Sequence, residues 1–210
     1  ADIARFNTGE LDMESLSSII STHETGLSFI AAPTFPDEGD YLSGDTLSSA
    51  ISILKENFQY VVMDLPHDFS PFALSGLDAA DAILLVSTPD MASVRATAAA
   101  LDAYSKLAYP REKIKPVLNA TFPRSSLSKE KIESAMGMSF VATMPYVSET
   151  VLEAINLGCP LVLDKPKENI SALLEDFAFH LSKPEHKKAK PEVPNETWKR
   201  VYKRYQDRKK

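Results

Sequence analysis

The sequence predicts an α/β fold with a doubly wound, mainly parallel sheet. Short apolar runs alternate with segments of helical periodicity, which is typical of strand-helix-strand crossover units. The apolar runs are nearly continuous, as expected for strands that are buried on both faces. The chain has 210 residues, of which 44% are hydrophobic and 25% charged, so it is long enough for one sizeable core.

Five apolar runs are the expected strands. None of them alternates apolar and polar residues as a half-exposed strand does. We therefore expect each run to lie within a sheet that is covered on both faces. In chain order the runs are Leu27–Ala32, Tyr60–Asp64, Ala82–Ser87, Ile114–Asn119 and Phe140–Met144.

The first helices between these strands have recognisable starts. We expect Asp45 to cap one helix and Asp90 another, because a carboxylate at the N-cap accepts hydrogen bonds from free amides of the first turn. Apolar residues follow each cap at helical spacing. These stripes are Leu47, Ile51 and Leu54 in the first helix, and Val94, Ala98, Leu101 and Ala108 in the second.

A third helix is predicted from signals at both of its ends. Ser128 is a suitable N-cap, and Leu127 and Ile132 flank it at the spacing of a hydrophobic staple. Gly137 is expected to end the helix in the left-handed conformation that glycine adopts readily.

The last helix of the core is indicated by an apolar stripe that stops before Pro184. Proline has no amide hydrogen and disfavours helical geometry in the residue before it, so we expect Pro184 to end the regular domain. We therefore predict a domain over residues 1–182 and a tail over residues 183–210. The stripe consists of Ile170, Leu173, Leu174, Phe177 and Leu181.

The tail differs from the rest of the chain in charge. Residues 1–182 carry a net charge of −13, whereas residues 183–210 carry +7. After a spacer rich in proline and lysine, Asn195 is a suitable cap for a short helix. Its aromatic face and basic flanks favour contact with a membrane, a partner or nucleic acid. A solvated, partly disordered end is the alternative. The face consists of Trp198, Val201 or Tyr202, and Tyr205.

Several classes of protein are excluded or disfavoured. Cys159 is the only cysteine, so neither an internal disulfide nor a zinc site with several cysteines can form. No apolar run reaches the roughly 18 residues that cross a bilayer, and no signal peptide opens the chain, so we expect a cytoplasmic location. The four histidines lack metal-ligand spacing, His67 is expected to be structural, and no serine has the partners of a hydrolase nucleophile.

Polar or rigid residues follow three of the predicted strands. Asp64 and Asn119 each end a strand, and Pro145 and Tyr146 follow the strand that ends at Met144. Ligands of open parallel sheets bind beyond the carboxyl ends of the strands. A carboxylate for hydrated Mg²⁺, an amide for an adenine edge and a rigid turn beside the base would suit a nucleotide. Ordinary turn or cap roles are the alternative for each residue.

The phosphate-binding loop that usually accompanies such residues is missing. That loop needs a glycine-rich turn and a glycine followed by lysine. None of the seven glycines of this sequence is followed by lysine.

From about Ile3 to Leu181 the chain resembles the MinD/ParA group of P-loop ATPases, and within it the CpaE/TadZ-like proteins of type IV (Flp/Tad) pilus assembly. The resemblance implies that Asp64 holds Mg²⁺ through water, that Asn119 reads the adenine of ATP, and that Pro145 and Tyr146 lie beside the base. It assigns no catalytic residue. The matching segments are Ser21–Pro33, Phe58–Pro66, Ala79–Asp90, Val117–Asn119 and Ala154–Pro160.

The chain departs from this family at its N-terminal side. The family begins with a strand, a Walker A loop with two lysines, a helix and a second strand, and the present sequence matches none of them. In the family's strand order the loop-bearing strand lies between Tyr60–Asp64 and Ala82–Ser87, so we expect exposed apolar edges here. Without the phosphate cradle, Asp64 and Asn119 would hold only the rim of a nucleotide, and this chain alone should not hydrolyse ATP.

Two explanations of this departure stay open: a fragment of a complete ATPase, or a naturally reduced pseudo-ATPase. The first implies a protein that dimerises in complete form and positions pilus or secretion machinery, with peripheral contact to the inner membrane through residues 195–210. The second implies a non-catalytic docking scaffold. A partitioning relative that uses its basic tail on DNA is a further, less favoured alternative.

Overall fold

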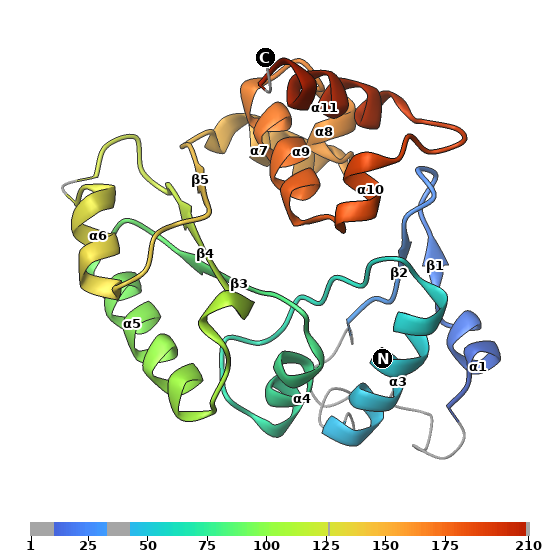
Figure 1. Ribbon diagram of the computed structural model, residues 1–210, viewed down its shortest axis with the longest axis horizontal. Coiled ribbons are helices and arrows are strands. Elements are labelled where there is room, and N and C mark those ends of the chain that lie inside the picture. Colours follow the sequence, from blue (N-terminus) through green and yellow to red (C-terminus); the bar gives the residue numbers. More distant parts are fainter. Residues whose placement is uncertain (1–10, 33–42, 126, 209–210) are drawn as a thin grey trace. The chain divides into compact units, whose positions relative to one another are not determined.

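The computed structural model describes residues 11–32, 43–125 and 127–208. The chain divides into two compact units, Ala1–Ile83 and Leu84–Lys210, and the boundary falls within strand β3 (Figure 1). The described part of the first unit contains helices and a small hairpin. Its elements are α1 (Met13–Ser17), β1 (Ser21–Thr22), β2 (Ser28–Phe29), α3 (Gly44–Asn57) and α4 (Pro71–Ala79).

The hairpin replaces the first strand expected from the sequence. Strand β2 pairs antiparallel with β1, and Gly26 in the turn has a φ of 84°. Leu27 is 63% exposed and Phe29 is 45% exposed. The prediction of a buried parallel strand over Leu27–Ala32 was therefore wrong. The apolar run instead pairs with β1 across a short local turn, and this pairing leaves Leu27 and Phe29 on the surface.

Helix α3 begins two residues earlier than expected. Ser43, rather than Asp45, is its N-cap and accepts a hydrogen bond from the Thr46 amide at 3.1 Å. Asp45 lies in the first turn, where a negative charge still interacts favourably with the helix dipole. Below the cap, Ala50 packs against Leu16 of α1, and both side chains are at most 1% exposed.

Helices α3 and α4 approach closely where Gly44 of α3 meets α4. A β-carbon on Gly44 would lie 2.5 Å from the Ser75 hydroxyl oxygen and 3.0 Å from the Pro71 carbonyl oxygen. A β-carbon contact of 2.5 Å is essentially never seen in proteins, so a side chain at this position would force α3, α4 or Ser75 to shift.

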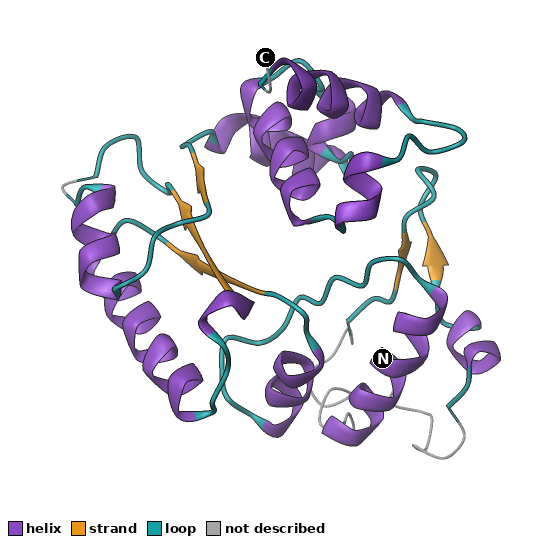
Figure 2. Cartoon of the chain, viewed as in Figure 1, coloured by secondary structure: helices purple, strands orange, loops and turns teal. Residues whose placement is uncertain are grey.

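Residues 58–70 form a loop in Figure 2, so the second predicted strand, Tyr60–Asp64, was wrong. Tyr60 is 48% exposed and Val62 is 90% exposed. A strand needs a neighbour to accept and donate its ladder hydrogen bonds, and no described strand pairs with this segment. An apolar, β-branched composition alone does not supply that neighbour.

The second unit contains the parallel sheet. Its strands lie in the order β3-β4-β5, and β4 pairs with β5 in parallel. This arrangement confirms the predicted α/β class. The elements are β3 (Ile83–Ser87), α5 (Met91–Lys106), the 3₁₀ turn η3 (Arg111–Lys113), β4 (Ile114–Asn119), α6 (Lys129–Met136), β5 (Ala142–Met144), α7 (Ser148–Leu157), α8 (Leu161–Asp164), α9 (Asn169–Leu181), α10 (Pro184–Lys188) and α11 (Glu196–Asp207).

Helices α5 and α6 lie side by side along one face of this sheet (Figure 1). Their inward side chains and those of β4 form one buried cluster, which excludes water from the middle of the unit. Leu127, at the start of α6, packs on the same cluster as its predicted staple partner. The cluster consists of Val94, Leu118, Ile132, Met136 and Phe140.

Three helix ends confirm their sequence signals. The Asp90 carboxylate accepts a hydrogen bond from the Ser93 amide at 2.9 Å and caps α5. The Ser128 hydroxyl accepts from the Lys131 amide at 3.4 Å and caps α6. Gly137 ends α6 with a φ of 66°, in the left-handed region. These signals are read correctly because each depends on a few adjacent residues.

Strand β3 is covered on one side only. Ile83 and Ser87 are buried, whereas Leu84 is 43% exposed and Val86 is 57% exposed. The expected burial of both faces was therefore wrong for this strand. It is also an edge strand of the described sheet: within residues 11–32, 43–125 and 127–208, no strand pairs with the edge of β3 that faces away from β4.

The C-terminal elements continue beyond the predicted end of the regular domain. Helix α9 ends at Leu181, and Pro184 occupies the first turn of α10, where its missing amide hydrogen costs no helical bond. Pro184 therefore starts a helix instead of ending the folded part. Within the described ranges, no helix combines the length and apolarity that crossing a bilayer requires.

Candidate functional site

The register of β4 and β5 brings two of the predicted site segments together. Asn119 is the partner of Met144, and the Ala120 amide donates to the Met144 carbonyl oxygen at 2.9 Å. That bond continues the ladder one step beyond the strands. Asn119 and Pro145 therefore leave the sheet at the same carboxyl edge, where ligands of open parallel sheets bind.

The Asn119 side chain is suited to recognising an amide-like edge. It is half-buried, and its amide group has no hydrogen-bond partner among the described residues. A carboxamide offers one acceptor and two donor hydrogens in a plane. That pattern complements the donor and acceptor groups of a purine edge, and the ladder below it fixes the position of the backbone.

Pro145 and Tyr146 form the neighbouring edge of the site. Both are exposed, and Tyr146 is 41% exposed. They connect β5 to α7 directly, so the chain has little freedom at this point. Proline fixes its own φ, and the Tyr146 ring adds an apolar surface with a hydroxyl at its tip. A flat ligand could lie against this edge.

Asp64 lies in the first unit, on the loop between α3 and α4. Its carboxylate is exposed and has no partner within the described part of the chain. The next residue, Leu65, is held against Gly76 of α4, which fixes the backbone beside Asp64. The structure thus brings Asn119, Pro145 and Tyr146 together and places Asp64 on a separate, anchored loop.

A single carboxylate fits Mg²⁺ bound together with a nucleotide. Mg²⁺ keeps several water ligands and is commonly held by one or two carboxylates plus phosphate oxygens. Across the described ranges, no group of three or more His, Cys, Asp or Glu side chains could hold a metal unaided. Asp64 could serve as one such carboxylate beside phosphate oxygens.

His67 takes part in a local turn beside this loop. The neighbouring Asp68 carboxylate accepts hydrogen bonds from the Ser70 hydroxyl at 2.7 Å and the Ser70 amide at 3.0 Å. These bonds, with a smaller contribution from the charge of His67, lower the pKa of Asp68. Ser70 in turn caps α4. His67 itself is exposed, and its structural role stays a prediction.

A cleft of about 270 Å³ lies at the carboxyl ends of β3 and β4. The Ser125 hydroxyl donates to the Pro89 carbonyl oxygen at 2.7 Å and joins the two loops that form it. Exposed Phe122 and Arg124, whose guanidinium has no partner in the described structure, supply an aromatic surface and a positive charge. The lining residues are Pro89, Asp90, Met91, Phe122, Arg124, Ser125 and Leu127.

Sequence reasoning missed Phe122 and Arg124. They lie on an irregular loop with neither helical nor strand periodicity, so no pattern marked them. The usable signal was their position directly after Asn119, because residues that follow a strand end share its edge of the sheet. The cleft places an exposed cation at the same edge as the unpaired Asn119 amide.

Comparison with known proteins places this fold. No protein-family model matches the chain. The septum site-determining protein MinD of Thermotoga maritima is 22% identical over 144 residues, which cover 66% of this chain and 52% of that protein. The chain thus spans about half the length of the curated relative that it matches.

Solved structures agree with this similarity. A ParA family ATPase from Chlorobium tepidum TLS superposes with a TM-score of 0.78 at 22% identity, over 86% of this chain and 74% of that one. MinD from Pyrococcus horikoshii OT3, complexed with Mg-ADP, gives a TM-score of 0.71 at 17% identity, over 90% and 80% of the two chains. The chain therefore has the α/β fold of the MinD/ParA-type P-loop ATPases.

Proposed function

We propose that this chain is the C-terminal portion of a CpaE/TadZ-like member of the MinD/ParA ATPases and carries the base-side and metal-side contacts for ATP. The observation that supports this most is the register of Asn119 with Met144, which puts the free Asn119 amide beside Pro145 at the carboxyl edge of the sheet. The similarity to MinD and ParA proteins, one of them complexed with Mg-ADP, supports the choice of ligand.

The proposed roles follow from the chemistry of each side chain. The Asn119 amide pairs with the adenine edge, while Pro145 and Tyr146 bound the base. Asp64 holds Mg²⁺ through a water ligand, as its single exposed carboxylate allows. We assign the partial ATPase domain to residues 1–182 and treat residues 183–210 as a basic C-terminal segment whose helix α11 packs on α9.

The chain alone is proposed to bind the nucleotide rim without hydrolysing ATP. Phosphoryl transfer depends on a positioned lysine and backbone amides around the phosphates, and no glycine of this sequence precedes a lysine. In complete form the protein would dimerise, hydrolyse ATP and localise pilus or secretion assembly proteins. Contact of residues 195–210 with an anionic membrane surface is part of the same proposal.

A non-catalytic docking scaffold is the second candidate, and the surface of β3 favours it. Leu84 and Val86 are 43% and 57% exposed on a strand that has only β4 as a neighbour among the strands that the structure describes. Apolar strand surfaces of this kind are interaction sites or aggregation sites unless they are covered. A scaffold would use that surface for a partner and would need no nucleotide.

Binding of a fluorescent adenine nucleotide to the purified chain, with Mg²⁺ present, separates the two candidates. We expect weak saturable binding that Asn119→Ala weakens about tenfold, since the lost hydrogen bonds to the base are worth about 1–2 kcal/mol. Asn156→Ala is the matched control, because Asn156 is exposed on α7. Equal affinities of the wild-type chain and Asn119→Ala would contradict the assigned site, and the absence of any nucleotide-dependent thermal shift would favour the scaffold.

A further inference from the structure

The α9 helix carries a carboxylate that is almost fully buried. Glu175 is 4% exposed as a residue, and its side chain is 1% exposed. Burial of an unpaired carboxylate is costly, because water no longer solvates the charge. The stability of this part of the unit therefore depends on the cations that α11 brings to Glu175.

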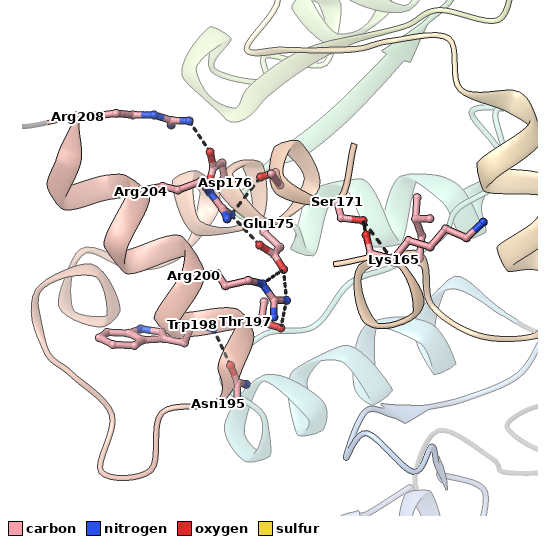
Figure 3. A network of polar contacts seen from close by, with 12 residues as sticks. Lys165, Ser171, Glu175, Asp176, Asn195, Thr197, Trp198, Arg200, Arg204 and Arg208 are labelled. Atoms are coloured by element: carbon pink, nitrogen blue, oxygen red, sulfur yellow. Dashed lines mark hydrogen bonds and ion pairs between the residues drawn. The ribbon is translucent and has the colours of Figure 1, made fainter. Parts of the chain in front are cut away.

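Arg200 and Arg204 of α11 supply these cations, and Arg208, the residue that caps the end of α11, pairs with the neighbouring Asp176. Arg200, Arg204 and Arg208 follow one another at a spacing of four residues, so they form one row on the helix. Figure 3 shows this row facing two adjacent acids of α9, Glu175 and Asp176. Arg200 and Arg204 are 31% and 27% exposed, whereas Arg208, at 68%, lies at the solvent-exposed end of the row.

The contacts of the row form one connected network. Arg204 bridges the two acids: Nη2 donates to Glu175 Oε2 at 2.7 Å, and Nε donates to Asp176 Oδ1 at 2.7 Å. Arg200 binds the other Glu175 oxygen through Nη2 and through Nε, the latter at 3.2 Å. Arg208 binds Asp176 Oδ2 at 2.5 Å. Each oxygen of the two carboxylates thereby accepts at least one charge-assisted bond.

The network also sets the pKa of its central residue. Partial burial of Arg204 opposes its charge, but its hydrogen bonds with Glu175 and Asp176 outweigh that effect and raise its pKa. The raised pKa favours the charged form of Arg204 in the folded chain.

Apolar contacts lie next to this network. Val201 is 4% exposed, and the Tyr205 ring meets Phe179 of α9 edge to face, with ring centroids 5.1 Å apart. The side of α11 that packs on α9 thus holds the three arginines, Val201 and Tyr205. We call these five residues and the two acids of α9 the α9–α11 clamp.

The outer side of α11 has a different composition. Lys199 and Lys203 are exposed there. Trp198 and Tyr202, which are partly exposed, stack on each other with centroids 4.5 Å apart. While the clamp is closed, an anionic surface would meet lysines and part of this aromatic pair, whereas the arginines and the buried valine are occupied.

Closure of the clamp is expected to stabilise α11 as a helix. The helix has 12 residues, a length that is marginal in water without tertiary contacts. Asn195 caps it by accepting from the Trp198 amide at 2.7 Å, but one cap adds only a small increment. Opening of the clamp would therefore release a flexible basic segment.

We propose that the α9–α11 clamp is an autoinhibitory latch, which holds the C-terminal helix on its own unit and withholds its arginine row and apolar side from anionic lipid surfaces. The binding half rests on the membrane contact proposed above, whereas the latch itself does not. Opening frees three arginines and exposes the apolar residues in one step. Membrane affinity then depends on competition between lipid phosphates and the two α9 carboxylates.

The latch is tested first by hydrogen exchange on the full chain. We compare the wild type with Asp176→Asn and with the double variant Glu175→Gln/Asp176→Asn. The control is Glu196→Gln, which removes an acid that pairs with Lys199 outside the clamp. Amides of α11 should exchange about tenfold faster or more in the double variant, and no faster in the control. Unchanged protection of α11 in both clamp variants would overturn the latch.

Global unfolding is separated from opening by the amides of β4 and α5, which must keep their protection. If the double variant loses it, Asp176→Asn alone carries the test, because that carboxylate is 17% exposed and tolerates a neutral replacement better. Arg208→Gln replaces a side chain that is 68% exposed and removes the same Arg208–Asp176 pair by changing the arginine instead of the acid. The absence of faster exchange in these milder variants would overturn the latch as well.

Vesicle co-sedimentation tests the withheld binding. With vesicles of phosphatidylserine and phosphatidylcholine, the clamp variants should pellet several-fold more than the wild type and the control, and deletion of residues 195–210 should abolish the gain. Pure phosphatidylcholine should give no gain. The lipid-directed role would be overturned, even where exchange supports the clamp, if a variant with faster exchange in α11 pellets with neither vesicle composition. The same conclusion would follow if the clamp variants gain as much binding to duplex DNA in the absence of lipid.

Discussion

Gly76 and Leu65 are in contact so close that no β-carbon fits between them. A β-carbon built on Gly76 would lie 2.8 Å from both terminal carbons of Leu65. The contact joins α4 to the loop that carries Asp64. The position of the proposed metal-side carboxylate therefore depends on the absence of a side chain twelve residues further along the chain.

Gly76→Ala should lower the free energy of unfolding by about 1 kcal/mol, because the strain of overpacking outweighs the helix propensity gained. Leu65→Ala should remove most of that penalty when the two changes are combined. Chemical denaturation of the two single variants and the double variant gives the coupling energy. A stabilised Gly76→Ala chain would show that Leu65 moves aside without cost.

Ile132→Ala should destabilise the second unit by about 2–4 kcal/mol. Ile132 is 1% exposed and lies in the cluster that joins α5, β4 and α6, so its truncation leaves a cavity. Ile155→Ala on α7 is the matched control, since Ile155 is 69% exposed and its loss should change stability by less than about 0.5 kcal/mol. Similar losses in both variants would contradict the assigned core.

Stability should fall in acid, and Asp90 should contribute to the fall. Hydrogen bonds from the Thr88 hydroxyl and the Ser93 amide lower the pKa of Asp90 in the folded chain. A lowered folded pKa stabilises the fold above the unfolded value of about 3.9, and this contribution is lost as the pH falls through the folded pKa.

Asp90→Asn keeps a capping side chain but removes the charge, so its stability should depend less on pH below about pH 5. Asp45→Asn, at a residue that does not cap its helix, serves as the control. Urea denaturation at a series of pH values measures both. Parallel profiles for the wild type and Asp90→Asn would refute the contribution of this cap.

Leu84→Thr/Val86→Thr should reduce association of the chain with itself. Both side chains project from the exposed face of β3. Threonine keeps the β-branched geometry that strands favour and reduces the apolar surface of that face. Light scattering at increasing concentration should show later onset of aggregation, with little change in the unfolding midpoint. Unchanged scattering would show that this surface is not the one that associates.

The accuracy of the sequence predictions follows the range of the interactions behind them. The start of α6 at Ser128 and its end at Gly137 were confirmed because adjacent residues decide them. The strand predicted over Tyr60–Asp64 was wrong because a strand requires a partner that may lie anywhere in the chain. The proximity of Asn119 and Pro145 was predictable, since parallel strands end at one edge.

The α9–α11 contact lay beyond sequence reasoning for a different reason. An amphipathic pattern marks an apolar side of α11 but does not show what covers it. The burial of Glu175 could not be predicted from the pattern of α9, because helical spacing does not distinguish a buried acid from an exposed one. Only the structure pairs Glu175 with Arg200 and Arg204.

The packing of α11 decides what optical probes of this chain report. Trp198 is the only tryptophan and lies on α11, so tryptophan emission follows the C-terminal helix. Circular dichroism averages over every helix and strand. Emission and dichroism curves should therefore separate on heating wherever α11 leaves α9 before the sheet melts, and a single midpoint from either signal would misstate the stability of the whole chain.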